Sequence, residues 1–255
     1  MYKGFNLSFN QDPSFSKNLF ELKSRGEKLN NDNRMAVKKT FDAFLADDGV
    51  FNGTRLQEDW FPQIKADVFI SHSHRDKDAA MAFAGWLAEK FKLNPFIDSC
   101  VWGCADDLLK IIDDKHCKNS NGAYIYDSLR GSASHIHMML VTALGMMIDN
   151  TECLMFLNTP NSITSKNVVS KTQSPWLYME LAMSQIVRRK TSRYHRQILE
   201  GAELVKKLEE AKLKFEYDVN LTPLAKITES TLTKWESEYA KQYKQHSLDT
   251  LYSIA

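Results

Sequence analysis

Short apolar runs alternate with amphipathic stretches along most of the chain. The runs at residues 66–71, 95–98 and 153–157 are rich in β-branched and aromatic residues, which is typical of buried strands in a parallel sheet. Between and after these runs, apolar residues recur at helical spacing and predict helices over residues 79–91, 106–114, 135–149, 176–187 and 232–243. The alternation predicts an α/β fold, a flavodoxin-like open parallel sheet with helices on both faces.

The first 64 residues follow a different pattern, without a strong strand signal. Residues 15–22 carry apolar side chains at the spacing of one helical face, and residues 35–45 predict a second helix. We therefore expect residues 1–64 to form a helical N-terminal extension, packed on a main domain of residues 65–255.

Four further segments shape this main domain. Residues 117–134 are polar and predict an insertion loop, and residues 158–174 predict a second loop rich in Ser, Thr and Asn. Residues 195–213 predict a charged amphipathic helix of a C-terminal helical elaboration, and residues 215–219 alternate like a strand at a sheet edge. The helix expected over residues 135–149 is apolar on nearly all faces, so we expect it to be buried.

Composition narrows the class of partner. The formal net charge is +1, so no overall electrostatic field favours nucleic acid or an anionic membrane as a partner. The longest apolar run, residues 138–148, is too short to cross a bilayer. The first residues lack a basic stretch followed by an apolar one, so we expect a cytoplasmic protein whose 4 cysteines are reduced.

Polar residues that follow the predicted strands are the candidates for a site, because ligands of open parallel sheets bind outside the carboxyl ends of the strands. The helix that begins at Pro175 starts in the same neighbourhood, and it carries Trp176 and Glu180 one turn apart on one face. Glu180 is the candidate catalytic residue. The candidate binding residues are Ser71, His72, Ser73, Asp98, Trp102, Asn158 and Trp176.

Three motifs in this order resemble a known family. Residues 67–73, Asp-Val-Phe-Ile-Ser-His-Ser, with Asp76 just behind, resemble the first signature box of TIR (Toll/interleukin-1 receptor) domains. Residues 96–98, Phe-Ile-Asp, resemble the second strand of these domains, which a loop bordering the active cleft follows. Residues 174–181 resemble the helix that carries the glutamate of NAD-hydrolysing TIR enzymes.

The resemblance covers residues 65 to 190 well and the remainder loosely. Residues 69–76, 102–114 and 134–161 further resemble the TIR-like subunit of Thoeris, a two-component bacterial antiphage system.

This resemblance implies a TIR-like NAD glycohydrolase or cyclase that makes an ADP-ribose-derived signalling nucleotide in antiphage defence. It implies NAD as a substrate and no further cofactor, a homo-oligomer, a phage-derived trigger, and a downstream effector protein that the messenger activates. The insertion at residues 117–134 and the long segment at residues 191–213 depart from a minimal TIR domain, so the identity of the product stays open.

Chemistry gives Glu180 a role that does not depend on the resemblance. Cleavage of the nicotinamide–ribose bond develops positive charge on the ribose, which one nearby carboxylate can stabilise. Nicotinamide leaves as a neutral group, so no general acid is obligatory, and a nearby helix N-terminus favours the ionised glutamate. We expect no metal, because Cys100, Cys104, His116 and Cys117 lack the spacing of a compact zinc site.

Other interpretations remain open at this point. Glu180 has the alternative of a surface glutamate on an amphipathic helix, and Trp102 has the alternative of core packing beneath its loop. The alternative function is a non-catalytic TIR-type assembly or interaction module. A phosphate-accepting receiver domain is disfavoured, because Ser71 and Asn158 stand where such a domain needs acidic residues.

Overall fold

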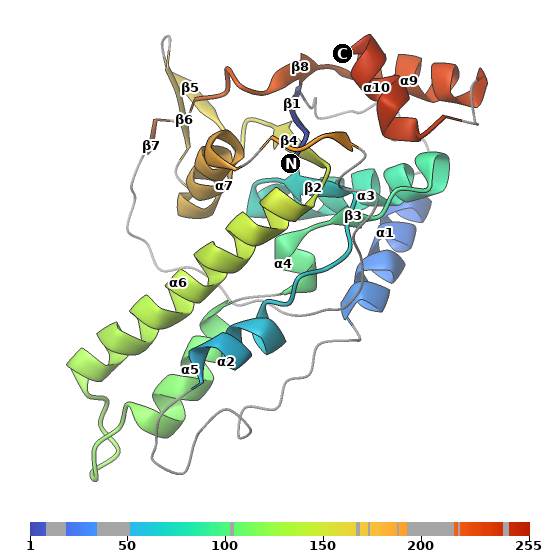
Figure 1. Ribbon diagram of the computed structural model, residues 1–255. Coiled ribbons are helices and arrows are strands. Elements are labelled where there is room, and N and C mark those ends of the chain that lie inside the picture. The colour runs from blue at the N-terminus through green and yellow to red at the C-terminus, as the bar shows by residue number, and fades with distance from the viewer. Residues whose placement is uncertain are drawn as a thin grey trace.

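A five-stranded, all-parallel sheet forms the centre of the molecule (Figure 1). The strand order is β3-β2-β4-β1-β8. The strands are β1 (Lys3–Ser8), β2 (Val68–Ser71), β3 (Pro95–Phe96), β4 (Cys153–Asn158) and β8 (Ala225–Ile227). This computed structural model describes residues 1–8, 19–34, 52–102, 105–166, 169–172, 174–187, 189–192, 217–218, 220–241 and 245–255. The α/β class expected from the sequence is confirmed.

Helices cover both faces of the sheet. The helices on one face are α2 (Gly53–Trp60), α5 (Ala105–His116), α6 (Tyr126–Asn150) and α7 (Pro175–Ile186). Those on the other face are α1 (Leu19–Arg34), α3 (Lys77–Phe91), α9 (Glu229–Lys241) and α10 (Ser247–Ile254). A short turn of helix, α4 (Asp98–Val101), follows β3, and a 3₁₀ turn (His74–Asp76) leads from β2 into α3.

Alternate side chains of the strands enter two separate cores, as the two-residue period of a strand requires. Phe69 and Phe156 pack in the core shared with α5, α6 and α7. Ile70 and Met155, their neighbours along the chain, pack in the core shared with α1, α3 and α9. Both faces of β2 and β4 are therefore apolar, which explains why these strands read as continuous hydrophobic runs.

Strand β1 corrects the expected domain organisation. Residues 1–64 are not an entirely helical extension, because β1 pairs in parallel with β4 on one side and with β8 on the other. Phe5 and Leu7 are fully buried. Gly4 interrupts the apolar run, and a side chain there would meet Leu224, since an added Cβ lies 2.5 Å from its Cδ2. The boundary expected at residue 65 therefore divides a single sheet.

The position of β1 also changes the connectivity of the sheet. Flavodoxin-like sheets have the strand order 2-1-3-4-5. Here β2, β3, β4 and β8 take the places of the first, second, third and fifth strands, and β1 takes the place of the fourth. The spatial arrangement is thus compatible with a flavodoxin-like sheet, although one central strand comes from the start of the chain.

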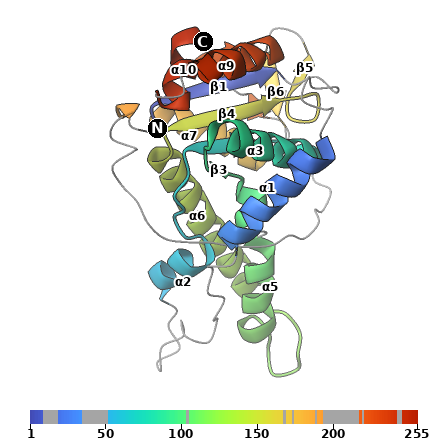
Figure 2. The ribbon, with the colours of Figure 1, turned by 90° about the vertical axis from the view of Figure 1, so that its right-hand side faces the viewer.

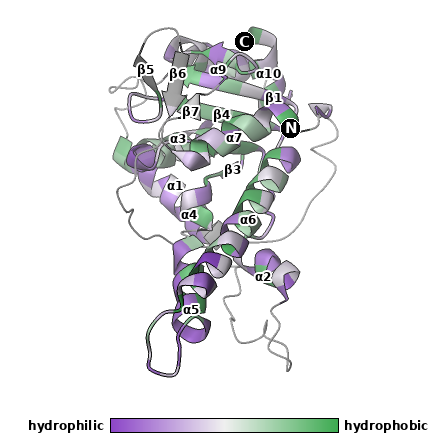
Figure 3. Ribbon diagram, turned by 90° about the vertical axis from the view of Figure 1, so that its left-hand side faces the viewer, coloured by the Kyte–Doolittle hydropathy of each residue, from purple (hydrophilic) through white to green (hydrophobic). Residues whose placement is uncertain are grey.

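Helix α6 is longer and more exposed than expected. It begins at Tyr126, inside the segment expected to be a loop, of which residues 117–125 remain as a short hairpin with a bridge between Lys118 and Tyr124. Its outer half and α5 project away from the sheet (Figure 3). The helix was expected to be buried, but only one of its faces is, and Met138 on another face is 62% exposed. By length and composition alone, α6 is the one helix in the described residues that qualifies as a membrane span, with a third of that window buried.

A second, smaller sheet replaces part of the expected loop at residues 158–174. Strands β5 (Thr164–Lys166) and β6 (Val169–Thr172) form an antiparallel hairpin, and β7 (Tyr217–Asp218) pairs with β6. The expected edge strand therefore forms at Tyr217–Asp218, but in this sheet and not in the main one. The helices expected over residues 35–45 and 195–213 lie outside the described residues.

Helices α1 and α3 pack closely side by side (Figure 2). They approach through Gly26 and Gly85, where an added Cβ would overlap the backbone carbonyl groups of Met81 and Leu22, respectively. Only glycine allows two helix backbones to come this close. The contact holds α1 against α3, which begins just after the loop that follows β2.

Candidate active site

The side chains of Ser71 and Glu180 meet at the carboxyl edge of the sheet. Ser71 is the last residue of β2, and Glu180 lies in the second turn of α7. The Ser71 hydroxyl donates a hydrogen bond of 2.6 Å to Glu180 Oε2. Ser71 is fully buried and Glu180 is only 3% exposed. The alternative of a surface glutamate is therefore wrong.

The local sequence of α7 explains why Glu180 faces inward. Ser174 caps the helix by accepting a hydrogen bond from the amide of Leu177, and Pro175 occupies the first turn, where its missing N–H costs nothing. The buried face of α7 then carries Leu177, Glu180, Leu181 and Ser184, at the spacing of one helical stripe. A carboxyl group in this apolar stripe is costly to bury, which favours a functional explanation for it.

Asp98 and His72 complete the group of polar residues. Asp98 begins α4 one residue after the end of β3, and His72 follows β2, so neighbouring strand ends bring both residues to the same edge. The charge of Asp98 acts on both Glu180 and His72. His72 is buried, and its Nε2 lies 3.3 Å from the hydroxyl of Ser99. Ser99 is not among the binding residues expected from the sequence.

Electrostatics at this edge differ from the expectation. Burial, together with the negative charge of Asp98, raises the pKa of Glu180 well above its ordinary value, while the hydrogen bond from Ser71 opposes this shift. The helix N-terminus was expected to favour the ionised form. That influence falls off within the first turn, and Glu180 lies in the second. Burial also lowers the pKa of His72, against the opposing charge of Asp98.

The other expected binding residues lie on β4, on α7 and in the 3₁₀ turn after β2. Ser73 is buried at the start of the 3₁₀ turn, where its carbonyl accepts a hydrogen bond of 2.8 Å from the amide of Asp76. Asn158 is the half-buried last residue of β4, the strand next to β2. Trp176 is half-buried in the first turn of α7, and its ring lies 5.8 Å from the ring of His137 on α6.

Trp102 has a different position. It is 1% exposed, and its indole nitrogen donates a hydrogen bond of 3.0 Å to the carbonyl of Pro62. Its ring packs edge-on against Phe61 and Phe96. The core-packing alternative therefore describes Trp102, and no face of its ring is available to a substrate. The segment after Asp98, expected as a loop, is the helical turn α4.

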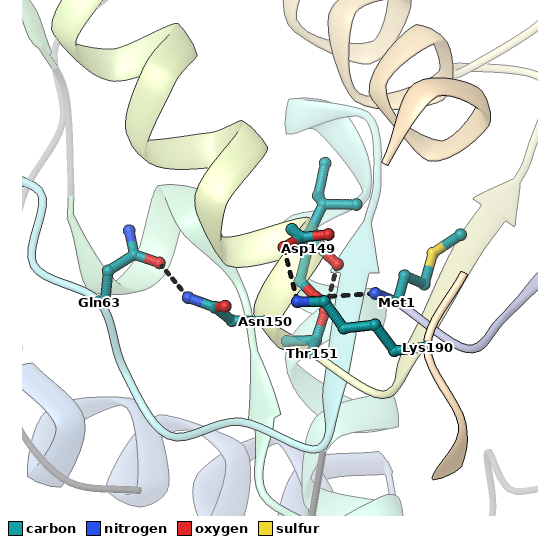
Figure 4. Close-up of polar contacts among 7 residues, drawn as sticks. Met1, Gln63, Asp149, Asn150, Thr151 and Lys190 are labelled. Atoms are coloured by element: carbon teal, nitrogen blue, oxygen red, sulfur yellow. Dashed lines mark hydrogen bonds and ion pairs between the residues drawn. The ribbon is translucent and has the colours of Figure 1, made fainter. Parts of the chain in front are cut away.

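A network of polar contacts joins the segment after α7 to the end of α6 (Figure 4). Lys190, just beyond α7, donates to Asp149 Oδ2 at 2.6 Å and to the Asp149 carbonyl at 3.2 Å. The amino group of Met1 donates to the same carbonyl at 2.7 Å. Asn150 also donates to the side chain of Gln63. These contacts hold Lys190, in the segment after the helix that carries Glu180, next to the start of the chain and the end of α6.

A hollow on the surface between α6 and α7 does not include Glu180 in its lining. It has a volume of about 510 Å³ between α6 and α7, and its lining includes Met138, Met146 and Met183. Within the described residues, no group of three or more His, Cys, Asp or Glu side chains is arranged to hold a metal ion.

The chemistry available at the sheet edge comes from Glu180. When ionised, its carboxylate can stabilise positive charge in a reacting group, and the hydroxyl of Ser71 can orient that carboxylate. No protein-family model matches this chain, and no curated protein or solved structure matches it either.

Proposed function

We propose that this chain is a TIR-like enzyme that cleaves the nicotinamide–ribose bond of NAD, as a glycohydrolase or a cyclase, with Glu180 as its catalytic carboxylate. The observation that carries this proposal is the buried carboxyl group of Glu180 at the carboxyl edge of the sheet, in contact with Ser71 and near Asp98. Buried carboxyl groups with shifted pKa values concentrate at functional sites.

The proposed reaction needs few groups. As the bond between the ribose carbon and the ring nitrogen breaks, its electron pair stays with the nitrogen and neutralises the pyridinium. Positive charge then develops on the ribose, where the carboxylate of Glu180 stabilises it. Water or another nucleophile completes the reaction at the ribose carbon. Ser71 keeps the carboxylate in position.

In the proposed complex, the cationic nicotinamide ring places a positive charge near Glu180. An opposite charge within about 4–6 Å favours the ionised carboxylate, which lowers its pKa again. Glu180 is almost fully buried, so the substrate reaches it only after the surrounding packing opens. Such opening fits an enzyme that a phage-derived trigger and homo-oligomer assembly activate.

In this proposal the protein acts in the cytoplasm of a bacterium under phage attack. Its product is an ADP-ribose-derived messenger that activates a downstream effector protein. NAD is the substrate of the proposed reaction, and the reaction needs no further cofactor. Mass spectrometry of the product would distinguish a cyclic ADP-ribose isomer from a hydrolysis product or a conjugate.

The test is nicotinamide release by purified protein, with and without lysate from phage-infected cells. Glu180→Gln keeps the size and the hydrogen bonding of the side chain but removes its charge. We expect a loss of about 2–4 kcal/mol of transition-state stabilisation, which is about 30- to 1,000-fold in rate. Unchanged release by this variant would rule out the catalytic role.

Glu152→Gln is the matched control. Glu152 is 2% exposed and accepts a hydrogen bond of 3.1 Å from the hydroxyl of Tyr252, so it is a buried carboxyl group with a similar partner. It precedes β4, at the opposite edge of the sheet from Glu180. We expect this variant to release nicotinamide at the rate of the unaltered protein.

A specific observation also favours a second candidate function, a non-catalytic TIR-type assembly module. Glu180 is inaccessible in the ligand-free protein, while Met138 and Met146 are 62% and 45% exposed beside the hollow between α6 and α7. An apolar surface of this kind can bind a second copy of the chain. Intact phage defence without NAD loss, in every condition above, would favour this function over catalysis.

A further inference from the structure

Asp76 stands at the start of α3 but does not cap it. It is the N-cap residue of that helix, where an aspartate usually accepts a hydrogen bond from a backbone amide of the first turn. Its side chain makes no such bond. The carboxylate of Asp76 is therefore used elsewhere.

Both oxygens of this carboxylate bind the turn that follows β4. Thr159 Oγ1 donates to Asp76 Oδ2 at 2.5 Å, and Asn161 Nδ2 donates to Asp76 Oδ1 at 2.7 Å. Two hydrogen bonds to one ionised group fix orientation as well as distance. One side chain thus joins the loop after β2 to the turn after β4.

The turn itself is organised around Thr159. The Thr159 hydroxyl donates a hydrogen bond to Asp76, and it accepts hydrogen bonds from the amides of Asn161 and Ser162 at 3.1 and 3.2 Å. The amide of Thr159 donates to the hydroxyl of Ser162 at 2.8 Å, and that hydroxyl donates to the carbonyl of Leu157 at 3.0 Å. A negative charge at the end of this chain of hydrogen bonds strengthens the chain.

We propose that Asp76 is a positioning residue that clamps the turn after β4 to the loop after β2, and thereby fixes Asn158 relative to Ser71 at the site. The inference rests on the proposed function, because it assigns this clamp to the binding of NAD. Asn158 directly precedes Thr159, and Ser71, the last residue of β2, directly precedes the loop that ends at Asp76. Each anchor is therefore only a few residues from a side chain of the site.

Asp76 could also act through its negative charge, which favours the N-terminus of α3 through the helix dipole. A variant of Asp78 is the control for this explanation. Asp78 lies in the first turn of α3 and forms an ion pair of 2.8 Å with Lys23 on α1, while its side chain is 75% exposed. It carries the same charge as Asp76 at the same end of the helix without contact to the turn after β4. Asp78→Asn thus removes the charge and leaves the clamp.

Hydrogen exchange tests the clamp without reference to NAD. In Asp76→Ala we expect the amides of Asn161 and Ser162 to exchange about tenfold faster or more, because their acceptor Thr159 loses its anchor. The amides of β4 should keep their protection in the same protein. Asp78→Asn should leave the whole pattern unchanged. Unchanged exchange at Asn161 and Ser162 in Asp76→Ala would overturn the clamp.

Kinetics test the positioning role. In this proposal the clamp positions Asn158 for binding and does not touch the reacting atoms. Asp76→Ala should therefore raise KM for NAD about tenfold and change kcat less than about twofold. Asp76→Asn retains the shape and one acceptor oxygen, so it should have a smaller effect and serves if the alanine variant does not fold. An unchanged KM despite faster exchange, or an equal rise in KM in Asp78→Asn, would overturn the positioning role.

The two tests separate this inference from the proposed function. If the unaltered, triggered protein cleaves no NAD, the proposed function fails together with the role in NAD binding. The exchange comparison still decides whether Asp76 clamps the turn. If Glu180→Gln alone loses activity and Asp76→Ala keeps a normal KM, the proposed function stands and the positioning role fails.

Discussion

The hydroxyl of Ser71 and the carboxyl group of Glu180 lie 2.6 Å apart, although 109 positions separate them in the sequence. The contact joins the end of a central strand to the inward face of a helix. It also opposes the rise in the pKa of Glu180 that burial causes. The two residues therefore form the unit on which the proposed chemistry depends.

Ser71→Ala should lower kcat/KM for NAD about tenfold, because a hydrogen bond to a carboxylate contributes about 1.5 kcal/mol or more. Ser184→Ala is the control. Ser184 lies one turn beyond Glu180, is equally buried, and donates to the carbonyl of Leu181. Nicotinamide release by the two variants checks the expectation, and equal rates would contradict it.

The raised pKa of Glu180 predicts a dependence of stability on pH. Its folded-state pKa lies above its unfolded value, so the folded protein holds this proton more tightly. The stabilisation from the bound proton is complete below the unfolded pKa, and it is lost as pH rises through the folded pKa. Glu180→Gln cannot lose a proton. The variant should therefore become more stable than the unaltered protein as pH rises above the ordinary glutamate value of 4.5.

Thermal unfolding of both proteins across this pH range provides the measurement. The other titrating groups are common to the two proteins, so the difference in Tm reports on Glu180. A difference that stays constant from pH 4 to 8, or that favours the unaltered protein at high pH, would show that the carboxyl group is ionised at little cost.

Two glycine substitutions should change the stability of the protein in opposite directions, one at the crossing of α1 and α3 and the other in α6. Gly26→Ala should lower the free energy of unfolding by about 1–3 kcal/mol, since the new methyl group meets the backbone of α3. Gly131→Ala, in α6, should raise it by about 0.5–1 kcal/mol, because nothing lies within 4 Å of the added Cβ and alanine favours the helix. Denaturant unfolding of the two variants measures both effects, and a tolerated Gly26→Ala would mean that the helices are farther apart.

The position of Trp102 predicts a defect in stability. Trp102→Ala removes a large side chain from the core and leaves the carbonyl of Pro62 without its donor. We expect a loss of about 3–5 kcal/mol in the free energy of unfolding. A variant with unchanged stability and reduced NAD turnover would instead support a role in substrate binding.

The sequence predicted best those elements that a short stretch of residues identifies without information on tertiary contacts. Strands β2 and β4 are buried on both faces, so their apolar runs identify them without tertiary information. Ser174 and Pro175 likewise mark the start of α7. The rule that ligands bind at the carboxyl ends of strands directed attention to Ser71, Asp98 and Glu180, and the structure brings these residues to one edge of the sheet.

The rest depends on tertiary contacts that a sequence pattern does not contain. Strand β1 is interrupted by Gly4 and Asn6, and it is a strand because β4 and β8 pair with it. An aromatic residue after a strand, such as Trp102, fits a binding loop and a core equally well before its neighbours are known. The pKa of Glu180 also follows from burial and from Asp98, which are properties of the assembled fold.

The place of β1 also sets the order in which the sheet can form. β1 comes first among the strands, yet Lys3 pairs with Cys153 and Phe5 pairs with Ala225. Strands β2, β3 and β4 can associate earlier, but they leave the edge of β4 unpaired until the beginning of the chain returns to it. Contacts between distant parts of a sequence slow folding, and an unpaired edge invites association with other chains. During synthesis, β1 therefore cannot take its place between β4 and β8 until most of the chain has been made.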